Sequence, residues 1–151
     1  MIFERIKQLI SLAVPLLVMV MPSPSDTEPK WSNWIAEQLH AEAEAGFTDE
    51  AGRGRVDVLT DKLAIEVEWP KTTKATESLR QASRYAKAFD REPAVIFLIG
   101  RGDRAVEKAI VSTVRQFGKE MEPPVNKVIW MDINDPDIAR VKRLLGMGFK
   151  P

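Results

Sequence analysis

The stretch RVDVLTDKLAIEVEW, residues 55–69, decides the fold predicted for this chain. It contains two short runs of β-forming residues, separated by a turn at residues 60–63. Three carboxylates, Asp57, Glu66 and Glu68, lie inside the runs rather than in the turn. Because side chains alternate between the two faces of a strand, Glu66 and Glu68 share one face. The stretch therefore predicts an antiparallel hairpin with an acidic face.

The length of the turn sets which carboxylates meet across the hairpin. A two-residue turn at Asp61-Lys62 places Asp57 directly opposite Glu66, and a three-residue turn shifts this register. Like charges in opposite positions destabilise a sheet, so a bound cation explains the first arrangement. Mg²⁺ suits such a site, because it prefers oxygen ligands and takes one or two carboxylates from a protein. The alternative is an acidic face exposed to water, with no ion.

The composition excludes several classes of site. The chain has 151 residues, enough for one domain, with 22 basic and 22 acidic side chains. A nucleic-acid surface must therefore be a local patch rather than a property of the whole chain. The chain has no cysteine and one histidine, His40. Disulfides, thiolate chemistry and cysteine zinc sites are thus excluded, and a histidine-rich metal site is too.

The N-terminus differs in composition from the rest of the chain. Basic residues precede an apolar run from Leu9 to Met21, which is shorter than the about 20 residues of a membrane-spanning helix. Residues 1–25 are predicted to be a signal peptide, with Ser23 and Ser25 as the small residues before a cleavage site, or a membrane anchor. A helix packed on the domain is a further alternative. We expect an exported or membrane-anchored protein of the bacterial periplasm or cell surface, with a cytoplasmic location as the alternative.

The remaining chain alternates between helical and strand patterns. Residues 26–30 are predicted to be a linker and residues 31–151 one domain. This order predicts an α/β fold, a mixed central sheet flanked by helices. The expected helices cover residues 31–45, 75–89, 103–118 and 135–146; the expected strands cover 55–59, 64–69, 94–99 and 127–131, with one ambiguous strand in 47–54.

A basic segment follows the acidic hairpin. Residues 71–91 carry six basic side chains. At helical spacing four of them fall on one side, opposite the apolar side: Arg80, Arg84, Lys87 and Arg91. Gln81 and Tyr85 lie on the flank of that face. A basic helix next to acidic strands is typical of a phosphate-binding surface beside a metal site, although a basic face alone is more often merely solvated.

Together these features resemble the PD-(D/E)XK nuclease superfamily. The matching parts are Asp57, the Glu66-Val67-Glu68 segment and the Gln81-x-x-x-Tyr85 pattern, the last of which is typical of the RecB-like branch and of its small stand-alone bacterial members. The resemblance covers residues 31–100 and implies a restriction-endonuclease-like α-β-β-β-α-β core, to which this chain adds a C-terminal α-β-α extension. It departs from the family pattern where Glu68 replaces the motif lysine.

The resemblance implies a metal-dependent nuclease that hydrolyses phosphodiester bonds in DNA or RNA. Asp57 and Glu66 would bind Mg²⁺ or Mn²⁺, and Glu37 is expected as an additional carboxylate ligand. Glu68 would bind a second ion or act as a base. Lys71 would take the role of the motif lysine, while the expected contacts to nucleic acid are Lys74, Gln81, Arg84 and Tyr85. The alternative is a catalytically degenerate nuclease-fold domain, acting as a nucleic-acid-binding or membrane-tethered assembly protein; a homodimer is open in either case.

Overall fold

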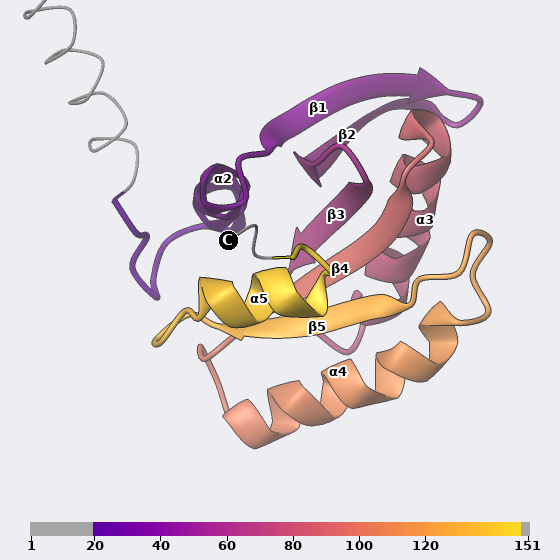
Figure 1. Ribbon diagram of the computed structural model, residues 1–151. Coiled ribbons are helices and arrows are strands. Elements are labelled where there is room, and N and C mark those ends of the chain that lie inside the picture. The colour runs from indigo at the N-terminus through magenta and orange to yellow at the C-terminus, as the bar shows by residue number, and fades with distance from the viewer. Residues whose placement is uncertain (1–19, 149–151) are drawn as a thin grey trace, which may run out of the picture.

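The hairpin of residues 55–69 forms the middle of a five-stranded sheet in the computed structural model, which describes residues 20–148. Helices cover both faces of this sheet (Figure 1). The predicted α/β class, with a mixed central sheet flanked by helices, is confirmed. In chain order the elements are α2 (Glu28–Gln38), β1 (Glu42–Asp49), β2 (Gly52–Leu59), β3 (Leu63–Glu68), α3 (Ala75–Phe89), β4 (Glu92–Ile99), α4 (Arg104–Gly118), β5 (Lys127–Asp132) and α5 (Ile138–Leu144).

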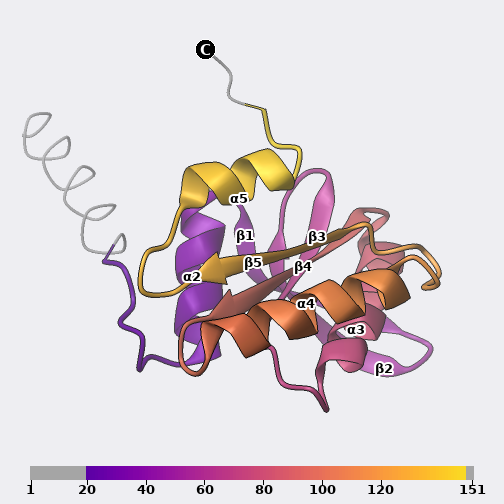
Figure 2. The same ribbon diagram turned by 90° about the horizontal axis from the view of Figure 1, so that it is seen from below.

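The strands follow one another across the sheet in chain order. Strands β1, β2 and β3 pair antiparallel, whereas β3, β4 and β5 pair parallel, so the sheet is mixed. Every residue of β4 except Glu92 is buried, as expected for a strand covered on both faces. Helices α2 and α5 pack on one face of the sheet, and α3 and α4 pack on the other. Figure 2 shows α5 and α4 on opposite sides of β4 and β5.

The first helix and the first strand differ from the prediction. Helix α2 begins at Glu28, inside the predicted linker, and ends at Gln38 rather than near residue 45. Pro29 stands in the first turn, a position that suits proline because the missing N–H has no partner there in any helix. Residues 42–45, which the sequence pattern assigns to the helix, belong to β1. Their alanines and glutamates favour a helix, but pairing with β2 overrides this preference.

Strand β2 is longer than predicted, because Gly52 and Gly54 belong to it rather than to a turn. Gly54 lies opposite Phe47 of β1. A Cβ at residue 54 would lie 2.3 Å from the Cζ atom of Phe47, so only glycine lets the ring cover the backbone there. The Phe47 ring then makes edge contacts with Tyr85 and Phe89 of α3. These contacts hold the β1–β2 hairpin against α3.

The outer edge of the sheet at β5 is covered by arginine side chains. Arg115 of α4 donates two hydrogen bonds to the Val128 carbonyl, and Arg140 of α5 donates one to the Trp130 carbonyl. The guanidinium of Arg140 also lies 3.9 Å from the centre of the Trp130 ring. The carbonyls of alternate residues along this edge are therefore satisfied, which protects the edge from pairing with another strand.

Most of the predicted leader lies outside the described range, because residues 1–19 are not part of it. Its last residues are described: Val20 and Met21 are exposed, and Pro22 is buried. Between residues 20 and 148 the chain contains no helix of the length and apolarity that a bilayer crossing requires.

Candidate metal centre

The hairpin has the register that a two-residue turn predicts. Val58 pairs with Ile65 and Leu59 with Ala64, and the Thr60 N–H donates to the Leu63 carbonyl at 2.9 Å. These pairs confirm the predicted register for residues 58–65. The predicted pairing of Asp57 with Glu66 is not part of the ladder, which ends at the Val58–Ile65 pair.

The ladder between β2 and β3 stops at the carboxylates. Beyond the Val58–Ile65 pair, the Val67 N–H donates to Oδ2 of Asp57 at 2.8 Å instead of to a strand carbonyl. A carboxylate that accepts a backbone N–H is fixed in direction, and this interaction favours its ionised form. Asp57 thus serves as a structural acceptor and as a charged group at the same time.

Asp57 and Glu66 form a carboxyl pair that is largely withdrawn from solvent. Asp57 is half-buried and Glu66 is only 8% exposed. Burial raises the pKa of Glu66 well above its ordinary value, and the charge of Asp57 raises it further. Burial also raises the pKa of Asp57, against the opposing effect of the Val67 N–H. The pair resists carrying two negative charges unless a positive charge lies beside it.

A further carboxylate comes from α2, and it is Glu28 rather than the predicted Glu37. Burial raises the pKa of Glu28 to about 7, and the charges of Asp57 and Glu68 act in the same direction. Glu37 instead lines a separate cavity of about 310 Å³ with residues that include Met21 and Trp34. Sequence reasoning misses Glu28 because the apolar spacing starts the helix at Trp31, one turn too late. The signal that identifies Glu28 is the proline directly after it, which marks the first turn of a helix.

The remaining acidic and aromatic groups border the pair. Glu68 is half-buried, and its Oε1 accepts the N–H of the next residue, Trp69, at 2.9 Å. Tyr85 of α3 is buried; burial raises the pKa of its hydroxyl, and the charge of Glu66 raises it further. Gln81, one turn earlier on α3, is half-buried.

Two cations act on these carboxylates. Arg55 of β2 lowers the pKa of Asp57, though less than burial raises it, and Lys74 opposes the increase at Glu28. The Arg55 side chain is 64% exposed and makes a loose 3.8 Å contact with Glu44. Sequence reasoning does not place Arg55 among the site residues. Lys71, the predicted replacement for the motif lysine, is exposed in the turn before α3, where its carbonyl accepts the N–H groups of the third and fourth residues after it.

Arg84 is held by the fold rather than being free for phosphate. Its guanidinium donates to both carboxylate oxygens of Asp49, at 2.7 and 2.9 Å, and to the Gly52 carbonyl. It lines a cavity of about 500 Å³ with residues that include Arg80 and Lys87. None of the four carboxylates of the hairpin and α2 lines this cavity. The basic face of α3 is therefore directed to a different surface from the carboxyl pair.

The carboxyl pair supplies the kind of oxygen atoms that a divalent ion such as Mg²⁺ prefers. Oε2 of Glu66 is fully buried and accepts no hydrogen bond from any group of residues 20–148. A buried carboxylate oxygen without a partner is costly, and an ion beside it removes that cost. Within the described range, however, no group of three His, Cys, Asp or Glu side chains is arranged to hold a metal. The protein thus offers the two carboxylates of the pair, a number that Mg²⁺ accepts when water completes its shell.

Comparison with known proteins gives no match. No family model, no curated protein and no solved structure is significantly similar to this chain.

Proposed function

We propose that the protein is a metal-dependent nuclease of the PD-(D/E)XK type that hydrolyses phosphodiester bonds in DNA. The observation that carries this proposal is the Asp57–Glu66 pair with its buried, unpartnered Oε2 atom. The order of the elements supports it, because α2, three antiparallel strands, α3 and the parallel strand β4 match the α-β-β-β-α-β core of that superfamily. Helix α4, β5 and α5 then form the C-terminal extension.

Asp57 and Glu66 would hold Mg²⁺ or Mn²⁺, with the Val67 carbonyl as a further oxygen ligand. When bound, the ion lowers the pKa of a water molecule and neutralises charge on the phosphate oxygens. The Val67 N–H orients Asp57 for this role at 2.8 Å. This contact preorganises Asp57 before substrate arrives.

Glu28 is the candidate base for the attacking water. Its pKa of about 7 lets its carboxylate accept a proton near neutral pH, which is the range in which a general base works best. Glu68, the alternative base, is engaged by its own backbone through the Trp69 N–H. Arg55 and Lys74 are exposed cations beside the carboxylates, so they would contact the phosphate on either side of the cleaved bond.

The test uses the full chain with supercoiled plasmid and single-stranded DNA in Mg²⁺ or Mn²⁺. Wild type should cleave, EDTA should stop cleavage, and Asp57→Asn should lose more than about a hundredfold in rate, beyond the loss typical of a ligand's supporting residue. The asparagine keeps an acceptor for the Val67 N–H, so the variant should fold. Asp61→Asn, an exposed substitution in the same hairpin, is the matched control. Absence of cleavage in wild type, or equal rates in both variants, would overturn the proposal.

A second candidate is a degenerate nuclease-fold domain that binds nucleic acid without cutting it. Two observations favour it: Glu68 stands where the motif has lysine, and the Asp49–Arg84 ion pair occupies the arginine of the Gln-x-x-x-Tyr helix. In that case DNA binding should be independent of metal and unchanged in Asp57→Asn. The same cleavage assay, run beside a binding assay in EDTA, separates the two candidates.

A further inference from the structure

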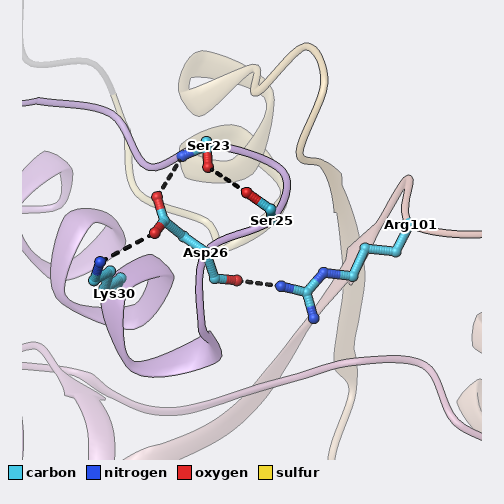
Figure 3. Close-up of polar contacts among 5 residues, drawn as sticks. All are labelled: Ser23, Ser25, Asp26, Lys30 and Arg101. Carbon is cyan, nitrogen blue, oxygen red and sulfur yellow. Dashed lines mark hydrogen bonds and ion pairs between the residues drawn. The ribbon is translucent and has the colours of Figure 1, made fainter.

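Residues 22–27, called the strap below, form a hydrogen-bonded turn before α2 begins. The Ser23 N–H donates to Oδ2 of Asp26 at 2.7 Å, and the Asp26 N–H donates back to the Ser23 carbonyl at 3.0 Å. Lys30, in the first turns of α2, pairs with Oδ1 of Asp26 at 3.1 Å. Figure 3 shows these contacts around the Asp26 carboxylate. Pro22 is buried at the start of the strap. The strap is thus a defined part of the domain.

One arginine ties this strap to the sheet. Arg101 follows β4, and its Nε donates to the Pro24 carbonyl at 3.0 Å. Its Nη2 donates to the Asp26 carbonyl, and Figure 3 shows this second contact. The same guanidinium lies 3.7 Å from the centre of the Trp69 ring, at the end of β3. A planar guanidinium can donate in its plane and stack through its face at once, which an ammonium group cannot do.

Both partners of Arg101 lead directly to carboxylates of the candidate metal centre. Trp69 follows Glu68 and donates its N–H to Oε1 of that side chain at 2.9 Å. Asp26 precedes Glu28 by two residues, at the point where α2 starts. Glu28 and Glu68 flank the carboxyl pair, and both act electrostatically on it. Arg101 is therefore linked to both flanking carboxylates through the strap and the Trp69 ring.

We propose that Arg101 is a positioning residue for the metal centre: through the strap and Trp69 it sets where Glu28 and Glu68 stand relative to the carboxyl pair. This inference rests on the proposed function, since it assumes that the pair binds a divalent ion. Glu28 and Glu68 would lie in the outer shell of that ion, and the loss of outer-shell groups typically changes metal affinity about 10–100-fold. Loss of Arg101 should act on ion binding and not merely on folding.

The experiment measures the affinity of the full chain for Mn²⁺ by calorimetry, with folding checked by circular dichroism. Arg101→Ala should bind Mn²⁺ at least about tenfold more weakly than wild type. Arg104→Ala is the matched control, because Arg104 is an exposed arginine three residues away that pairs with Asp132 rather than with the strap. Should Arg101→Ala fail to fold, Arg101→Lys replaces it; a smaller loss is expected, because lysine cannot reach both carbonyls while stacking.

A second substitution tests the route through the strap. Asp26→Ala opens the turn from the other side, so it should weaken Mn²⁺ binding as well. Combined with Arg101→Ala, its effect should be less than additive, because both changes release the same strap. Full additivity, unchanged binding in Arg101→Ala, or an equal loss in Arg104→Ala would overturn the inference. Absence of Mn²⁺ binding in wild type would instead overturn the proposed function, and this inference with it.

Discussion

The sheet has one region where polar groups have hydrogen-bond partners and another where a buried polar group has none. At β5, arginines satisfy the carbonyls of Val128 and Trp130, and the Trp130 ring is covered by the Arg140 guanidinium. Between β2 and β3, the Glu66 carboxylate keeps an oxygen without a partner, although it is more deeply buried than those arginines. The fold therefore has the means to satisfy buried polar groups but does not use them at the carboxyl pair. Among residues 20–148, the other buried side-chain atom without a partner is Nε1 of Trp31. An unsatisfied carboxylate oxygen is the costlier of the two, and such a group is typical of a functional site.

Removing an arginine that covers the β5 edge should have the largest effect on stability. Arg140→Ala removes a charged donor from the Trp130 carbonyl and the stacking on its ring, so it should lower the free energy of unfolding by about 2–3 kcal/mol. Urea denaturation measures this change. Mn²⁺ affinity should stay at the wild-type value, because β4 separates β5 from β3 and its carboxylates. An unchanged free energy of unfolding, or an altered ion affinity, would remove the contrast between the two regions.

A substitution beside the carboxyl pair should instead change the rate of DNA cleavage. Glu28→Gln removes the carboxylate that the structure brings to the pair, so cleavage should slow by about 10–100-fold. Glu37→Gln, nine residues along the same helix, tests the position that the sequence indicated. The two rates, measured side by side on one DNA substrate, should differ by at least about tenfold. A larger loss of rate in Glu37→Gln would show that Glu37, as predicted from the sequence, and not Glu28 is the carboxylate that α2 contributes to the site.

The smallest expected effect is the pH dependence of stability in metal-free protein. The pKa of Glu28 is about 7 in the folded state against an ordinary value of 4.5, so the folded state binds more protons between these values. Stability should therefore fall as pH rises from about 4.5 to about 7, by about 1–2 kcal/mol once solvent screening of this half-exposed group is allowed for. Glu28→Gln should show a smaller decrease, because only the raised pKa values of Asp57 and Glu66 then contribute to it. Thermal melting of both proteins in EDTA across that range measures it, and parallel curves would contradict the assignment.

The sequence alone was sufficient for the hairpin and for α3. The alternation of residues 55–69 and the short turn determine the register of the Val58–Ile65 and Leu59–Ala64 pairs, and the bounds of α3 match the prediction. The first half of β1 was assigned to a helix because its alanines and glutamates are helix formers, and only tertiary pairing places them in the sheet. Arg101 could not have been identified, because its partner Pro24 is 77 residues away and offers only a backbone carbonyl. Contacts of that kind leave no pattern in a sequence.

The hydrogen bond from Val67 to Asp57 also bears on which ion the protein would select. Oδ2 of Asp57 accepts the Val67 N–H, which leaves Oδ1 for an ion. Asp57 is therefore suited to coordinate an ion through one oxygen. Ca²⁺ takes about six to eight oxygens at long distances and often binds carboxylates through both atoms, whereas Mg²⁺ accepts single oxygens at short distances and retains its waters. The hydrogen bond from the backbone of β3 would in this way favour small octahedral ions such as Mg²⁺ over larger ions such as Ca²⁺.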